Sequence, residues 1–316
     1  MNTFYTLDGK LYKLSSDKHI NLIKSFLDEN YLFLESTDTS KSTNIVYSKE
    51  LLYHYLKNNV IIGMLNNDGK GDLIGVISGK VIKIIEQEVE KNVVEVNFLS
   101  VSNKHRGLGI AKILRENLKR FFKIKTAYYT TSYPLKNPAF CIASIKHFNI
   151  KRNCDKYKDK VVKLDKMKKG DISSVELLLS KNKYHISIKL DKNFLDDLIK
   201  SPIKCYVSRK GSNITGFVSF YETVKKTGGV ITDVICNLYY YSDLSTLYEC
   251  LILICNNYPK FTDIQCCIIG NNCHYKLSEW GFNPGTGIMY YNMFKVDNHR
   301  FVPNFYNPED VNLLMI

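Results

Sequence analysis

The chain is organised around the stretch Val93-Val94-Glu95-Val96-Asn97-Phe98-Leu99-Ser100-Val101-Ser102-Asn103-Lys104-His105-Arg106-Gly107-Leu108-Gly109-Ile110-Ala111-Lys112-Ile113-Leu114. Apolar and polar residues alternate from Val94 to Asn97, which predicts a strand. The alternation breaks at Phe98-Leu99, which predicts a local irregularity there. After a short polar turn, apolar residues recur at helical spacing from Ile110. The predicted order is therefore strand, glycine turn, helix.

The two glycines of this turn favour a phosphate-binding loop. Gly107 and Gly109 let the backbone approach a ligand closely, and their amides lie at a helix N-terminus, where partial positive charge gathers. A tight turn between a strand and a helix, with no ligand, is the alternative interpretation, because a glycine pair alone is a weak signal.

Two motifs in this stretch resemble known acyltransferases. Arg106-Gly107-Leu108-Gly109-Ile110-Ala111 resembles the pyrophosphate-binding motif of the GNAT acyltransferases. Glu95-Val96-Asn97-Phe98-Leu99-Ser100-Val101 resembles the Glu-Ile-Asn-Phe-Leu-Cys signature of the glycylpeptide N-myristoyltransferases, which contain two tandem GNAT-like halves. The resemblance covers nearly the whole chain. It implies an α/β fold of two fused GNAT-like domains related by an internal pseudo-twofold duplication, with a mixed central sheet flanked by helices.

The sequence itself indicates a duplication. Ile214–Phe220 is similar to Leu73–Gly79, and Ile231–Ile235 is similar to the signature strand at a like interval, but no Gly-x-Gly turn follows it. We therefore expect residues 1–160 to form an N-terminal half that binds acyl-CoA. Residues 161–316 should form a C-terminal half that binds peptide, with the C-terminal tail returning to the first half.

Composition narrows the class of protein. The chain has 316 residues, 45% of them hydrophobic, and a net charge of +13. Its apolar runs are too short to cross a bilayer and its N-terminus lacks the pattern of a signal peptide, so we expect a cytoplasmic protein. The lysines are scattered, which argues against a specific nucleic-acid site. The nine cysteines lack zinc-ligand spacing, so no metal is expected.

The start of the chain departs from the family. Tyr5-Thr6-Leu7, followed by a helix that leads to Asn30-Tyr31, resembles a family stretch that is normally preceded by a segment packing on the coenzyme. We expect this chain to lack that segment, so that coenzyme binding depends more heavily on the glycine loop, is weaker, or uses other groups.

The residues contain no Ser-His-Asp or Cys-His pattern, so a hydrolase is not expected. Acylating an amine requires a positioned thioester, donors for an oxyanion and a base. By the resemblance, the amides of Phe98 and Leu99 form the oxyanion hole, Thr130 contacts the incoming amine, and the terminal carboxylate of Ile316 is the base. Burial of that apolar end would raise the proton affinity of the carboxylate.

The resemblance assigns two further sets of residues. Those that hold the coenzyme are Phe98, Leu99, Ser100, Val101, Arg106, Gly107, Leu108, Gly109, Ile110 and Ala111. Those that contact the substrate peptide are Tyr31, Thr130, His147, Ser219, Tyr221, Gly285 and Gly287, with the register uncertain by one residue between Lys146 and His147.

The function implied is transfer of myristate from myristoyl-CoA, as co-substrate, to the N-terminal glycine of proteins, by direct attack and without a metal. The partners would be N-terminal glycine peptides or nascent proteins, with the ribosome as a further partner, and the enzyme would be a monomer. Two alternatives stay open: a GNAT-type N-acetyltransferase that uses a shorter acyl-CoA, and a non-catalytic protein that binds acyl-CoA or N-termini.

Overall fold

The computed structural model describes residues 4–6, 9–31, 42–66, 71–122, 126–131, 141–151, 157, 160–267, 274–295 and 311–312. The first half contains β1 (Phe4–Thr6), β2 (Gly9–Leu14), α1 (Ser16–Asn30), β3 (Thr43–Tyr47), α2 (Lys49–Leu56), β4 (Val60–Leu65), β5 (Leu73–Glu86), β6 (Val89–Val101), α3 (Ile110–Phe121), β7 (Thr126–Thr131) and β8 (Cys141–Lys151). The second half contains β9 (Leu164–Lys166), α4 (Ile172–Leu179), β10 (Ile186–Ile188), α5 (Lys192–Ile199), β11 (Lys204–Lys210), β12 (Asn213–Thr227), β13 (Val230–Tyr241), α6 (Leu244–Asn257), β14 (Asp263–Cys267), α7 (His274–Glu279), β15 (Asn283–Lys295) and β16 (Val311–Asn312).

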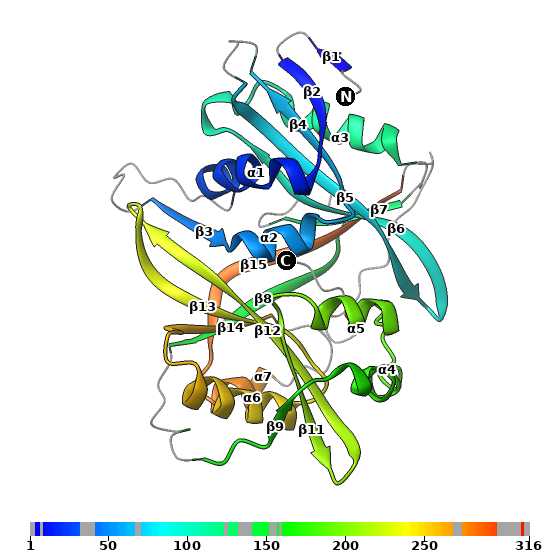
Figure 1. Ribbon diagram of the computed structural model, residues 1–316, viewed down its shortest axis with the longest axis vertical. Coiled ribbons are helices and arrows are strands. Elements are labelled where there is room, and N and C mark those ends of the chain that lie inside the picture. Colours follow the sequence, from blue (N-terminus) through cyan, green and yellow to red (C-terminus); the bar gives the residue numbers. More distant parts are fainter. Residues whose placement is uncertain are drawn as a thin grey trace.

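The first half is a mixed sheet with helices on both faces (Figure 1). Strands β1, β2, β4, β5 and β6 are antiparallel in that order, and β7 runs parallel to β6. Helix α3 packs on one face through Ile110, Leu114 and Leu118. Helices α1 and α2 pack on the other face through residues such as Ile23 and Leu52. The predicted apolar face from Ile110 is therefore the face that α3 buries.

The second half repeats this arrangement. Strands β9, β11, β12 and β13 are antiparallel in order, and β14 runs parallel to β13. Helix α6 packs on one face, in a cluster with α7. Helices α4 and α5 pack on the other face, in the same cluster as α1 and α2. The two halves thus meet through equivalent helix pairs, as the duplication in the sequence predicts.

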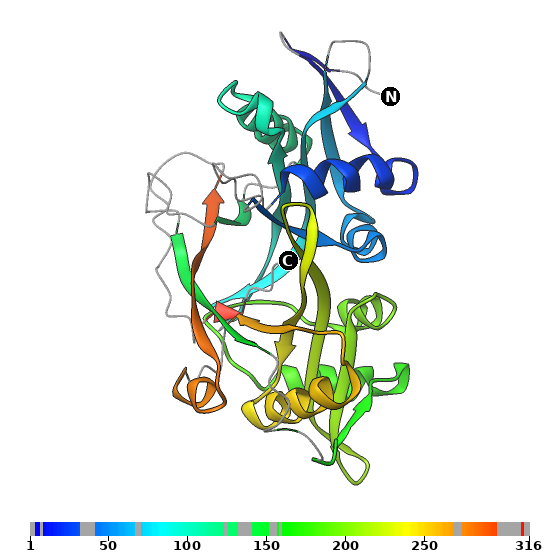
Figure 2. The same ribbon diagram turned by 90° about the vertical axis from the view of Figure 1, so that its left-hand side faces the viewer.

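The halves exchange their last strands. The order across the middle of the sheet is β7, β15, β8, β14, so β15 of the second half lies between β7 and β8 of the first. Figure 2 shows β8 and β15 side by side between the two halves. Two shorter strands also cross, since β3 pairs with β12 and β10 pairs with β5. The sheet is continuous, and a domain boundary near residue 160 stays a prediction.

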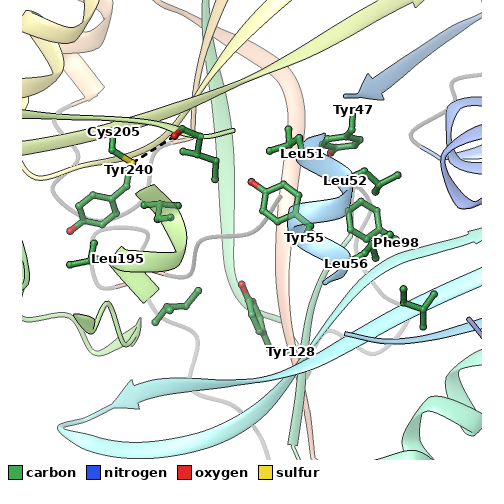
Figure 3. Packing of buried hydrophobic residues seen from close by; sticks show 14 of the residues in the cluster. Tyr47, Leu51, Leu52, Tyr55, Leu56, Phe98, Tyr128, Leu195, Cys205 and Tyr240 are labelled. Atoms are coloured by element: carbon green, nitrogen blue, oxygen red, sulfur yellow. Dashed lines mark hydrogen bonds between the residues drawn. The ribbon is translucent and has the colours of Figure 1, made fainter. Parts of the chain in front are cut away.

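One apolar cluster fills the space between the halves (Figure 3). Leu51, Leu52, Tyr55 and Leu56 of α2 lie on one side, Leu195, Cys205 and Tyr240 of the second half lie on the other, and Tyr128 of β7 lies beside them. Burying a large apolar side chain contributes about 1.5–3 kcal/mol, so this shared cluster holds the halves together.

Candidate active site

Strand β6 carries a β-bulge at Phe98 and Leu99. Val76 of β5 pairs with Ser100 and Ser78 pairs with Asn97, so Phe98 and Leu99 together oppose the single residue Ile77. Phe98 has a φ of 55°, in the left-handed region, which costs a residue other than glycine about 1–2 kcal/mol. A bulge of this kind leaves an extra residue outside the ladder. The irregularity predicted at Phe98-Leu99 is confirmed.

Two tyrosines hold the strained residue in place. Phe98 is buried, and its ring centroid lies 5.4 Å from that of Tyr31 and 5.9 Å from that of Tyr47, while the two tyrosine rings are 6.3 Å apart. Burial raises the pKa of Tyr31 to about 12, so this phenol stays neutral. A strained backbone conformation persists where contacts with the surroundings hold it in place, and the three-ring cluster supplies such contacts for Phe98.

The strands beside the bulge separate as they approach it. Among the described residues, β7 pairs with β6 only at Ala127 with Val94 and at Tyr128 with Glu95, although β7 continues to Thr131. Thr130 lies on this continuing part and pairs on its other side with Tyr291 of β15. Thr130 therefore lies two residues beyond Tyr128, the last described residue of β7 that pairs with β6, where the two strands diverge.

The glycine loop links the bulge to α3. A single 3-10 turn covers Asn103–His105, then Gly107 has a φ of 84° and Gly109, the N-cap of α3, a φ of 78°. No described atom lies within 4 Å of the Cβ that either glycine would carry, so the loop backbone is open to a ligand. Open amides at a helix N-terminus are an anion site. The loop is therefore open where the sequence predicts phosphate binding, and the binding itself stays a prediction.

Close packing fixes where α3 begins. A Cβ added to Gly75 of β5 would lie 2.9 Å from Ile110 Cγ2 and 3.0 Å from Leu114 Cδ1. The first turn of α3 can therefore approach β5 only because residue 75 is glycine. This approach positions the loop directly after the bulged strand.

The equivalent helix of the second half has no open anion site. Asp243 is the N-cap of α6, and its Oδ1 accepts from the Thr246 amide at 2.9 Å. Its Oδ2 accepts from the hydroxyls of Ser242 and Thr246, both at 2.7 Å. A carboxylate of the chain itself occupies the position that the glycines leave open in the first half. Only the first of these two helix N-termini is left open by glycines, and acyl-CoA binding by the first half stays a prediction.

The residues expected to contact a peptide lie on the central strands of the sheet. Ser219 of β12 is fully buried, and no described group lies within hydrogen-bond distance of its Oγ. Tyr221 is partly buried, and its ring centroid lies 6.0 Å from that of Tyr239. The backbone of His147 pairs with Cys267, and the run that contains Gly285 and Gly287 interrupts the pairing of β15 with β8 opposite His147. Ile316 lies outside the described residues.

A buried ion pair on β6 was not assigned from the sequence. Glu95 is buried, and its Oε2 lies 3.0 Å from Lys80 Nζ on the neighbouring strand. Its alignment with Tyr128 places it beside a tyrosine whose pKa burial raises well above its usual value. A carboxylate between the apolar residues Val94 and Val96 was the available signal, because charged residues are buried almost only when they are paired.

Comparison with known proteins finds sequence similarity to acyltransferases. Residues 5–141 match the family described as myristoyl-CoA:protein N-myristoyltransferase, N-terminal domain. A putative glycylpeptide N-tetradecanoyltransferase of Acanthamoeba polyphaga mimivirus is 26% identical over 327 residues, which cover 94% of this chain and 84% of that protein. The N-terminal part of the chain is thus similar in sequence to the N-terminal domain of N-myristoyltransferases.

Solved N-myristoyltransferase structures share the fold. Two structures of the Saccharomyces cerevisiae N-myristoyltransferase with bound myristoyl-CoA match with TM-scores of 0.81 and 0.80, at 20% and 19% identity. Each match covers 100% of this chain, and 87% and 91% of the respective yeast chains. The expected fold of two GNAT-like units with a mixed sheet flanked by helices is confirmed.

Proposed function

We propose that this protein transfers myristate from myristoyl-CoA to the N-terminal glycine of proteins. The observation that carries the proposal is the left-handed bulge at Phe98, placed one short turn before an open glycine loop at a helix N-terminus. This arrangement brings the proposed oxyanion donors and the proposed phosphate site onto consecutive segments. The match of residues 5–141 to the N-terminal domain of the N-myristoyltransferases supports the same conclusion.

The coenzyme would bind along β6 and the loop. The amides from Gly107 to Ala111 would hold the pyrophosphate, with the Arg106 side chain at the loop entrance. The backbone of Phe98, Leu99, Ser100 and Val101 would line the path of the thioester arm. Leu108 is exposed and adds an apolar side chain to the open loop. Myristoyl-CoA is then a co-substrate, and no metal takes part.

The reaction is a direct acyl transfer. The glycine amine, once deprotonated, attacks the thioester carbonyl and forms the new N–C bond. The charge that develops on the carbonyl oxygen would be stabilised by the amides of Phe98 and Leu99 at the bulge. The tetrahedral intermediate collapses with cleavage of the C–S bond, and coenzyme A leaves as a thiolate that then takes a proton. Thr130 would orient the amine.

The base is proposed to be the carboxylate of Ile316. Its support is the direction of β16, which runs parallel to β10, while β10 runs antiparallel to β5. The chain at Val311–Asn312 therefore runs in the direction of decreasing β5 residue number, from Glu86 toward Ile77, the residue opposite the bulge. We expect a peptide extension after Ile316 to abolish turnover while acyl-CoA affinity is kept. Normal rates in the extended protein would remove this base.

The substrate peptide would lie between the halves. We propose contacts with Tyr31, Thr130, His147, Ser219, Tyr221, Gly285 and Gly287. The buried Oγ of Ser219 supports this placement, because a buried hydroxyl without a partner among the described residues costs stability unless a ligand satisfies it.

We extend the proposal to a cytoplasmic monomer that lipidates nascent chains. The net charge of +13 favours work near the anionic ribosome surface. Among the described helices, none has the length and apolarity to cross a bilayer.

The test compares acetyl-, octanoyl- and myristoyl-CoA as donors to a peptide that begins with glycine and to the same peptide beginning with alanine. Mass spectrometry should show a 14-carbon acyl group on the glycine peptide alone. Transfer of acetate alone would contradict the proposal, as would tight coenzyme binding without turnover.

A further inference from the structure

The C-terminal end of α1 is joined to the glycine loop by side chains. The Oδ1 of Asn30 accepts from the backbone amide of Asn103 at 3.1 Å, and Asn103 opens the loop. The backbone carbonyl of Asn30 accepts from Arg106 Nη2 at 3.4 Å. A cation beside helix C-terminal carbonyls is favourable. The loop that would hold the coenzyme is therefore attached at two points to one residue of another helix.

The same residue also ends its helix. The Nδ2 of Asn30 donates to the carbonyl of Phe26 at 2.9 Å, while the amide of Tyr31 donates to the carbonyl of Leu27 at 2.9 Å. Asn44 of β3 donates to the carbonyl of Asp28. Carbonyls in the last turn of a helix lack partners within the helix, and here side chains satisfy them.

Asn30 is followed directly by a ring that contacts the bulge. Tyr31 packs on Phe98, the strained residue of the proposed oxyanion hole, and on Tyr47, which ends the strand β3 that pairs with β12. A continuous set of contacts thus runs from the glycine loop through Asn30 and Tyr31 to Phe98. Its far end reaches a strand bound to the second half.

We infer that Asn30 is a positioning residue that couples occupancy of the glycine loop to the geometry of the bulge and the peptide site. Binding of a coenzyme's phosphates would fix Asn103 and Arg106, and their contacts with Asn30 would hold Tyr31 against Phe98. The inference rests on the proposed function. Coupling between two sites requires an element that contacts both sites and whose conformation depends on both. The end of α1 contacts both the glycine loop and the bulge.

The test measures peptide affinity with and without a non-reactive myristoyl-CoA analogue, in the full chain, by titration calorimetry. Asn30→Ala should weaken peptide binding to the coenzyme-bound protein by about fivefold, the usual effect of losing a hydrogen bond of this kind, and leave peptide binding without coenzyme unchanged. Asn30→Asp keeps the acceptor for Asn103 and places a negative charge beside Arg106, so it should restore most of the coupling.

Asn117→Ala is the matched control. Asn117 Nδ2 donates to the Ile113 carbonyl at 2.8 Å, the same contact four residues back that Asn30 makes in α1. This variant should lose similar thermal stability and keep the coupling. Equal peptide affinities for Asn30→Ala and Asn117→Ala with the analogue bound would overturn the inference. Failure of the wild-type chain to bind the analogue at all would instead overturn the proposed function.

Discussion

Replacing Gly109 with alanine separates the backbone role of this residue from its role in binding. Its φ of 78° disfavours any side chain by about 1–2 kcal/mol, and a more restricted unfolded chain returns about 0.4–1 kcal/mol. No described atom lies within 4 Å of the new Cβ, so no clash within the protein adds to this cost. We expect Gly109→Ala to lower the free energy of unfolding by about 1 kcal/mol.

The same methyl group should matter more to the coenzyme. It would project into the open space from which a phosphate approaches the loop amides, so we expect acyl-CoA affinity to fall at least about tenfold, or about 1.4 kcal/mol. Thermal unfolding and titration calorimetry measure the two effects separately.

Gly211 provides a control at equal backbone cost. It has a φ of 63°, lies in the turn between β11 and β12, and also has no described atom within 4 Å of an added Cβ. Gly211→Ala should match Gly109→Ala in stability and leave acyl-CoA affinity unchanged. If both variants bind acyl-CoA equally well, the loop is only a turn and the reasoning is refuted.

Three further predictions concern stability. Burial lowers the pKa of His54 to about 4 from 6.5, so the unfolded chain binds more protons between these values. Stability should therefore fall as the pH drops from 7 to 4, and His54→Gln should flatten this slope in thermal melts; an unchanged slope would contradict the assignment to His54. Gly216→Ala should lower the free energy of unfolding strongly, because the new Cβ would lie 1.9 Å from Thr246 Oγ1. Adding Thr246→Ala should recover part of the lost stability. No recovery would mean that this clash is not the cause. Asp243→Ala should cost about 1 kcal/mol through loss of the α6 cap, with acyl-CoA affinity intact, and a change in that affinity would contradict a site confined to the first half.

Local signals in the sequence accounted for the centre of the site. A break in apolar alternation predicts the bulge at Phe98, and two glycines before a helical repeat predict the loop. Both depend on neighbouring residues, because strand period and turn chemistry are local properties of the chain. The resemblance to a family placed these features in an acyltransferase.

Hydrophobic periodicity does not predict contacts between segments that are distant in the sequence. Nothing in the apolar pattern of β15 indicates that it lies between β7 and β8, since pairing partners are chosen by the whole fold. The Tyr31, Tyr47 and Phe98 cluster joins residues up to 67 positions apart, and the link from Asn30 to Asn103 spans 73 positions. Single-sequence reasoning places Tyr31 at a helix end and Phe98 at a strand irregularity, without their partners.

The exchange of β8 and β15 bears on how the protein is made. During synthesis, β7 emerges long before Asn283–Lys295, the segment that covers its free edge. Until then the first half exposes an unpaired strand edge, which invites pairing with other chains. We expect an N-terminal fragment that ends near residue 160 to aggregate when expressed alone, and co-expression of the remaining residues to rescue it.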